Sequence, residues 1–261
     1  MAEFESSHDF RDFADFVKKA STYVLDGKWQ HFMDVLLETS KKRRTSLSKG
    51  DSLWRAQLGE EEGHHRTDGI EDERSDGLES VEKAHPHHWE RMKPRTDKVC
   101  EGRVNPKGVP YLYLSTERDT AMIEVRPVIG AYVSVARFVI LKDLSLVDCV
   151  SDTRRPTIYP IGTPVPRDEQ EEVVWGSVNQ AFSKLVTRCD DVADYVPTQI
   201  LAKKFREAGF DGIKYGSKRG NGKSIVLFDL TVADVDRCDL YQVEAFNPRF
   251  LKGMYSYNVP K

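Results

Sequence analysis

Apolar residues near the start of the chain recur at helical spacing. Phe10, Phe13 and Val17 follow one another at intervals of three or four residues, which predicts a helix that begins near residue 8. Gly27 interrupts the pattern, and a second apolar stretch then runs to Leu37. We therefore expect residues 1–48 to form an N-terminal helical region, an amphipathic pair packed on the main domain. The basic run at residues 41–44 leaves docking to a membrane surface or a nucleic acid as the alternative.

Strand-like and helix-like stretches are mixed in the rest of the chain. Helical spacing predicts helices at residues 117–124, 169–186 and 198–208, with Thr116 as an N-cap and Gly209 as a C-cap. β-rich or alternating runs predict strands at residues 53–56, 111–115, 132–141, 144–147, 211–215, 224–229 and 240–245. Because the order shows no strict βαβ rhythm, we expect an α+β fold in a domain over residues 49–245, followed by a C-terminal tail at 246–261.

A polar insertion interrupts this domain at about residues 59–98. It is rich in Glu, Asp and His and has almost no apolar periodicity, which is typical of a long surface loop. The stretch holds five histidines, at positions 64, 65, 85, 87 and 88. They lack the helical H-x-x-x-H spacing of a metal site, so a solvated loop is favoured over metal binding.

Composition and charge exclude several classes of protein. The 261 residues are 39% apolar, and no run of about 18 apolar residues is present, so we expect no transmembrane helix. The first residues lack the basic and apolar regions of a signal peptide, which favours a cytoplasmic protein. A net charge of −3 argues against duplex binding through phosphate neutralisation, except through a partner. The four cysteines form no C-x-x-C pair, so we expect free thiols.

A glycine-rich run at residues 216–224 resembles a phosphate-binding P-loop but departs from its pattern. The P-loop needs four residues between its first glycine and the Gly-Lys-Ser end, whereas Gly216 and Gly222 enclose five. A P-loop also leads into a helix, and this run leads into the strand-like residues 225–228. We therefore interpret it as a connection between strands that lines a pocket.

In three other segments, polar residues interrupt regular patterns. These are residues 102–110, residues 111–116 with the following helix to Glu124, and residues 209–217. Two glycines and two prolines shape the first segment and present Arg103 and Asn105 from a turn. Glu124 ends an apolar helix, where a buried carboxylate is costly unless it is used.

These segments together resemble the RES domain, named for its recurring Arg, Glu and Ser. The matching stretches are GRVNPKGVPYLYLSTERDTAMIEV, then YVPTQILAKKFREAGFDGIKYGS, then IVLF, within residues 50–230. WRAQ at residues 54–57 resembles the strand that opens this domain. The resemblance implies an ADP-ribosyltransferase-like fold, with a mixed or antiparallel sheet core and flanking helices. It also implies consumption of NAD, by hydrolysis or phosphorolysis, and often a role as the toxin of a bacterial toxin–antitoxin pair.

The resemblance also implies site residues. The family's Arg, Tyr, Glu and Ser fall on Arg103, Tyr113, Glu124 and Ser217, and Arg55 matches an earlier family Arg. The insertion between Arg55 and Arg103 is longer and more acidic than the family pattern, and the N-terminal helices lie outside the core domain. Both features bear on partner choice.

The chemistry of NAD suits these residue types. Loss of nicotinamide develops positive charge on the ribose, which a carboxylate such as Glu124 stabilises. A guanidinium fork on Arg103 or Arg55 binds pyrophosphate oxygens, Tyr113 stacks on a ring, and Ser217 hydrogen-bonds ribose or phosphate. We assign Asn105 to NAD binding as well, and no step calls for a metal.

The leading hypothesis is thus an NAD glycohydrolase or phosphorylase that acts as a toxin or defence effector. A protein ADP-ribosyltransferase on the same scaffold and a non-catalytic module that binds a nucleotide or protein are the alternatives. Beyond NAD, the expected partners are a cognate antitoxin and a second copy of the chain, with no membrane.

Overall fold

The computed structural model describes residues 3–19, 27–61, 84–151, 165–184 and 192–245. The strands in these ranges are β1 (Arg44–Leu47), β2 (Ser52–Leu58), β3 (Leu112–Ser115), β4 (Tyr132–Ile140), β5 (Leu144–Asp148), β6 (Gly212–Gly216), β7 (Lys223–Leu227) and β8 (Ala233–Gln242). The helices are α1 (Asp9–Lys19), α2 (Gly27–Lys42), α3 (Trp89–Met92), α4 (Arg118–Glu124), α5 (Arg167–Ser183) and α6 (Val196–Glu207), with the 3₁₀ turns η1 (Val192–Tyr195) and η2 (Leu230–Val232). The expected α+β class is confirmed.

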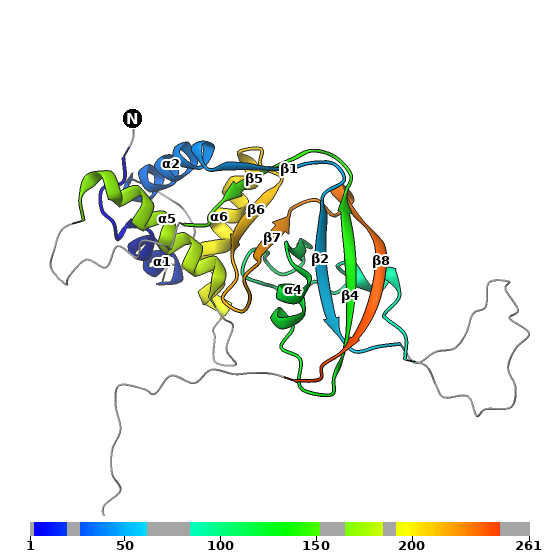
Figure 1. The fold of residues 1–261 in the computed structure, drawn as a ribbon. Coiled ribbons are helices and arrows are strands. Elements are labelled where there is room, and N and C mark those ends of the chain that lie inside the picture. The colour runs from blue at the N-terminus through cyan, green and yellow to red at the C-terminus, as the bar shows by residue number, and fades with distance from the viewer. Residues whose placement is uncertain (1–2, 20–26, 62–83, 152–164, 185–191, 246–261) are drawn as a thin grey trace, which may run out of the picture.

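The described strands form one mixed sheet in the order β1-β5-β6-β7-β3-β2-β4-β8 (Figure 1). All neighbours are antiparallel except β5 and β6, which run parallel. β2 pairs with β4 along its whole length, but with β3 only through Trp54 and Ser115. The sheet is therefore two halves, β1-β5-β6-β7-β3 and β2-β4-β8, that meet at a single residue pair.

Helices α1 and α2 lie near the start of the chain and share the main core, and the short strand β1 follows α2. Helices α1, α2, α5 and α6 gather beside the β5-β6-β7 half of the sheet (Figure 1). Phe13 is fully buried, and its ring stacks on Phe32 with centroids 5.0 Å apart. The same cluster of buried side chains includes Trp175 and Phe205 from α5 and α6. The apolar face of the first helix is thus part of the hydrophobic core.

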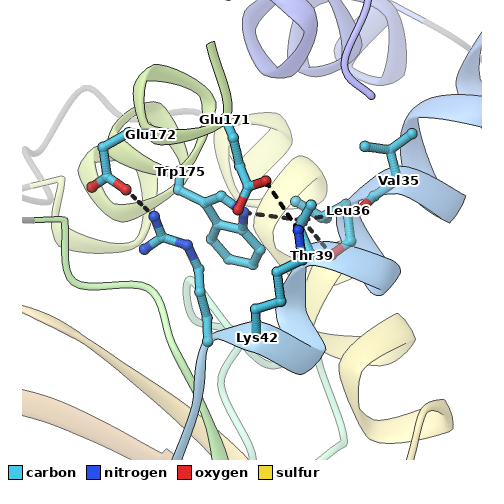
Figure 2. A network of polar contacts seen from close by, with 8 residues as sticks. Val35, Leu36, Thr39, Lys42, Glu171, Glu172 and Trp175 are labelled. Atoms are coloured by element: carbon cyan, nitrogen blue, oxygen red, sulfur yellow. Dashed lines mark hydrogen bonds and ion pairs between the residues drawn. The ribbon is translucent and has the colours of Figure 1, made fainter. Parts of the chain in front are cut away.

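The basic run at the end of α2 is engaged within the protein. Lys42 Nζ lies 3.8 Å from Glu171 of α5, and the Arg43 guanidinium pairs with Glu172. Between these pairs, Trp175 Nε1 donates a hydrogen bond of 3.1 Å to Thr39 Oγ1 (Figure 2). These contacts favour packing of the helical pair on the domain over docking to a membrane or a nucleic acid.

Several expected elements differ from the structure. Thr116 is not the N-cap of α4, because that position belongs to Glu117, and the Thr116 hydroxyl instead accepts from the Lys223 N–H. The last strand begins at Ala233, not at residue 240. The prediction missed its first residues because charged, exposed positions obscure the alternation of apolar and polar residues. β1 was missed because the strand has only four residues and three of them are polar. Gly209, with φ +87, does follow the end of α6 as a C-cap glycine.

The described part of the polar insertion is partly ordered against the sheet. His87 is buried, and its backbone N–H donates to Ser134 Oγ at 2.9 Å while its ring nitrogen lies 3.1 Å from the Leu58 carbonyl. This histidine is therefore a packed residue and not part of a solvated loop. His64, His65, Cys189, the proline loop near residue 160 and the tail at 246–261 lie outside the described residues. Cys100, Cys149 and Cys238 are free thiols.

No helix within the described ranges is long and apolar enough to cross a bilayer.

Replacement of Phe13 by Ala tests whether the helical region belongs to the core. Because the ring is fully buried, we expect the substitution to lower the free energy of unfolding by about 3–5 kcal/mol. Leu141→Ala is the control: this side chain is 46% exposed, and we expect a change within about 0.5 kcal/mol. Chemical denaturation measures both. A loss below about 1 kcal/mol for Phe13→Ala would contradict the shared core.

Candidate functional site

A cavity of about 430 Å³ opens where the two halves of the sheet separate. The strands β2 and β3 pair only at Trp54 and Ser115 and then diverge. β2 and β3 are therefore not paired with each other at Arg55 and Tyr113. Helix α4 packs against β2 and β3 beside the opening (Figure 1). The volume lies within the range of small-molecule sites, about 300–1,000 Å³.

Five of the six residues assigned from the sequence line this cavity: Arg55, Arg103, Asn105, Tyr113 and Glu124. The sixth, Ser217, is not among the lining residues, but its hydroxyl donates a hydrogen bond of 2.6 Å to Glu124 Oε1. The structure therefore brings together residues that are up to 162 positions apart in the sequence, from Arg55 to Ser217.

Tyr113 and Asn105 hold the turn that carries Arg103. The Tyr113 hydroxyl donates to Asn105 Oδ1 at 2.7 Å and accepts from the Val104 N–H at 3.2 Å. Burial, with a smaller contribution from the Tyr215 phenol, raises the pKa of Tyr113 well above its ordinary value, so this hydroxyl stays protonated and remains a donor. A Cβ at Gly102 would lie 2.8 Å from Asn105 Oδ1, so glycine is required for this close approach.

Helix α6 fixes the same turn from the other side. Gln199 Nε2 donates to the carbonyl oxygens of Gly102 and Asn105, at 2.9 and 3.2 Å. Thr198 Oγ1 donates to the Arg103 carbonyl. The backbone on both sides of the Arg103 side chain is thus anchored by hydrogen bonds, which makes the guanidinium a preorganised group.

The Arg103 guanidinium lies over an aromatic ring at the cavity wall. Its central carbon is 5.9 Å from the centroid of the Tyr215 ring, and its Nη1 donates to the Lys184 carbonyl at 2.6 Å. Burial raises the pKa of the Tyr215 phenol, and the Arg103 charge opposes that shift. Tyr215 was not singled out from the sequence, although it lies in a segment that was. Its alternating position in a strand, typical of a core residue, hid it.

Arg55 differs from the other polar residues of the site in lacking a partner for a buried atom. Its Nε is inaccessible to solvent and makes no hydrogen bond among the described residues. Burial lowers the pKa of the Arg55 guanidinium to about 10, partly opposed by the nearby Tyr113 phenol. The group remains a cation at neutral pH. An unpaired buried cation is costly, so the wall at Arg55 is suited to an anion.

Glu124 is the carboxylate of the cavity and is held by the glycine-rich turn. Besides the Ser217 hydroxyl on Oε1, Arg219 Nε lies 3.9 Å from Oε2. The Glu124 side chain is 28% exposed, so it remains accessible from the cavity. A carboxylate that lines the same cavity as the Arg55 and Arg103 guanidiniums is able to stabilise a cation that develops on a ligand. The guanidiniums are suited to the anionic part of such a ligand.

Other groups complete the rim and floor. Arg95, Lys98 and the exposed Cys100 lie at the cavity, all from the segment before Gly102. Ser224 on β7 also lines the cavity, next to Tyr215 on the paired strand β6. In the described part of the chain, no three His, Cys, Asp or Glu side chains gather into a metal-binding group.

Comparison with known proteins identifies the family. A family model described as the RES domain matches residues 80–247, which is more than half of the chain, and the chain therefore belongs to the RES domain family. The matched stretch begins after β2, although β2 supplies Arg55 and pairs fully with β4. No curated protein matches the sequence. Among solved structures, a chain of the M. tuberculosis MbcT–MbcA toxin–antitoxin complex is similar at 13% identity and a TM-score of 0.40, over 79% of this chain and 92% of that one.

The bond between Tyr113 and Asn105 is open to a direct test. Tyr113→Phe removes the donor and leaves Asn105 Oδ1 and the Val104 N–H unsatisfied, so we expect a loss of about 1–3 kcal/mol in the free energy of unfolding. Tyr132→Phe is the matched control, because in the described part of the chain the Tyr132 hydroxyl makes no hydrogen bond. A double-mutant cycle with Asn105→Ala should give a coupling energy of at least about 0.5 kcal/mol. Additive effects would show that the two side chains do not hold the turn together.

Proposed function

We propose that this protein is an NAD-degrading enzyme that cleaves the bond between nicotinamide and ribose. The observation that carries the proposal is one cavity, in a RES domain, whose lining includes the guanidinium groups of Arg55 and Arg103 and the carboxylate of Glu124, from distant parts of the chain. A dinucleotide with a pyrophosphate and a cationic pyridinium ring matches this arrangement of charges.

In the proposed reaction, Arg103 and Arg55 bind the pyrophosphate and fix the nicotinamide ribose beside Glu124. The C1′–N bond breaks, and its electron pair leaves with the ring, which neutralises the pyridinium. Positive charge then develops on the ribose, and the Glu124 carboxylate stabilises it. A water or phosphate oxygen forms the new bond to C1′. When water is the acceptor, its proton passes to solvent. No metal takes part.

Three residues support these groups. Ser217 holds Glu124 Oε1, while Tyr113 and Asn105 hold the turn of Arg103, and both also line the cavity. Because the polar atoms of Asn105 are already engaged with Tyr113 and the Cys100 carbonyl, we assign Asn105 to NAD binding through the turn that it shapes.

The biological role proposed with this activity is that of a toxin in a bacterial toxin–antitoxin pair. Its support is membership of the RES family and the resemblance from which the toxin role was expected. A cognate antitoxin that covers the cavity is the proposed partner. Expression of the chain alone should lower cellular NAD and stop growth, and the Glu124→Gln variant should do neither.

Nicotinamide release from NAD by the purified protein tests the activity. We expect release in the wild type and a loss of about 10²–10³-fold in kcat for Glu124→Gln, because the charge that stabilises the ribose cation is gone. Asp119→Asn is the matched control, since this exposed carboxylate lies on the same helix, and we expect full activity.

The same assay distinguishes water from phosphate as the acceptor, and it also tests the two alternative functions. Faster release with added phosphate indicates phosphorolysis, and an unchanged rate indicates hydrolysis. Labelled ADP-ribose on protein would favour a transferase instead. Binding of NAD without any release, in a folded wild-type protein, would favour a non-catalytic module.

Arg55 gives a second, independent prediction. Because Arg55 Nε is buried and makes no hydrogen bond among the described residues, we expect Arg55→Met to raise KM for NAD by roughly 10- to 100-fold through loss of charge-assisted hydrogen bonds. The same change should raise the melting temperature of the free protein, since it removes an uncompensated buried charge. Arg137→Met is the control away from the cavity, where a partly exposed guanidinium pairs with Asp236, and it should leave KM unchanged. An unchanged KM for Arg55→Met would exclude an anion at this wall.

A further inference from the structure

The glycine-rich run at residues 216–224, which is not a P-loop, lies along one face of α4. Three positions on the α4 side, each four residues from the next, contact this run: Thr116, Thr120 and Glu124. The Lys223 N–H donates to Thr116 Oγ1 at 2.8 Å, and the Gly222 N–H donates to Thr120 Oγ1 at 3.0 Å. The Ser217 hydroxyl then reaches Glu124, the last of the three. The glycine-rich run and the segment from Thr116 to the end of α4 therefore run antiparallel, with hydrogen bonds at three successive points.

Two glycines allow this close approach at Thr120. A Cβ at Gly220 would lie 2.3 Å from Thr120 Oγ1, and a Cβ at Gly222 would lie 2.8 Å from the same atom. Neither glycine has a positive φ, so the reason for glycine is the space that Thr120 occupies. The two glycines that make this run resemble a phosphate-binding loop are thus explained by their close contact with the Thr120 side chain.

The Ser217 side chain connects the geometry of the turn to Glu124. Its Oγ accepts from the N–H groups of Arg219 and Gly220, at 3.1 and 3.2 Å, and donates its own proton to Glu124 Oε1. The position of this hydroxyl is therefore set by the backbone of residues 219–220, and Thr120 packs directly on that backbone. Thr120 is 1% exposed, and its hydroxyl is also within 3.5 Å of Glu117 Oε2.

We propose that Thr120 is a positioning residue for the reaction: by fixing the turn on α4, it holds Ser217, and through Ser217 it orients the Glu124 carboxylate. The inference rests on the proposed function and extends it to a residue that touches neither substrate nor the reacting atoms. Its effect should appear in the transition state, because Glu124 acts on the charge that develops on the ribose.

Thr120→Val and Thr120→Ser test the proposal with nicotinamide release as the readout. Valine keeps the shape but removes the acceptor for the Gly222 N–H, so we expect kcat to fall roughly 10- to 100-fold with KM for NAD unchanged. Serine keeps the hydroxyl and should restore kcat to near the wild-type value. Equal kcat in Thr120→Val and the wild type, or a loss confined to KM, would overturn the proposal.

A matched control separates positioning from general destabilisation. Thr39→Val removes a buried hydroxyl that accepts from Trp175 between α2 and α5, where neither residue lines the cavity, so it should lower the melting temperature and leave kcat unchanged. A double variant with Ser217→Ala adds a second criterion. If Thr120 acts through Ser217, Thr120→Val should lower kcat no further once Ser217 is alanine. Multiplicative losses would show that Thr120 acts by another route.

A crystal structure of Thr120→Val keeps this inference distinct from the proposed function. A wild type that releases no nicotinamide would refute the activity, but the distance from Ser217 Oγ to Glu124 Oε1 would still report on the linkage. We expect that distance to exceed 3.5 Å in the variant, and a value still near 2.6 Å would overturn the proposal. If Thr120→Val does not fold, Gly222→Ala replaces it in each experiment, because its new Cβ displaces the turn from Thr120.

Discussion

The pairing of β2 with β3 through Trp54 and Ser115 alone is the constraint on which the site depends. A fully paired sheet would close the space between these strands with backbone hydrogen bonds and would leave no room for a ligand. One pair keeps the two halves joined, and the strands then diverge so that Arg55 and Tyr113 face the same cavity. Helix α4 packs beside the opening and places Glu124 at its edge. The candidate site is thus a consequence of an interrupted sheet.

The polar groups around the cavity divide into a fixed frame and free groups. Tyr113, Asn105 and Gln199 use their hydrogen bonds on the turn of Arg103, so they contribute rigidity. Among the residues that the structure describes, no group hydrogen-bonds the buried Arg55 Nε, and an unpaired buried charge of this kind carries an electrostatic cost. Such a division is expected of a binding site, where the frame is stabilised by internal contacts and the exposed charges are reserved for the ligand.

Local patterns predicted much of this structure. The amphipathic helices beside β5, β6 and β7 were accessible from the sequence, as were the strands that follow apolar runs. The grouping of Arg103, Tyr113 and Glu124 was accessible through family resemblance. The short strand β1 and the charged start of β8 were not, because their residues give no alternation and only pairing with β5 and β4 orders them. Tyr215 and Thr120 were missed for a similar reason: their roles depend on contacts with distant segments, which no local spacing encodes.

β2 precedes the stretch that the family model covers, yet it is an interior strand, with β3 on one side and β4 on the other. The aromatic side chains of α1 and α2, also outside that stretch, fill the core against α5 and α6. A fragment limited to residues 80–247 would expose a row of unpaired backbone groups on β4 and a large apolar surface on the helical layer. The boundary seen by sequence comparison is therefore not a boundary of the folding unit, and any trimmed version of this protein must retain its first sixty residues.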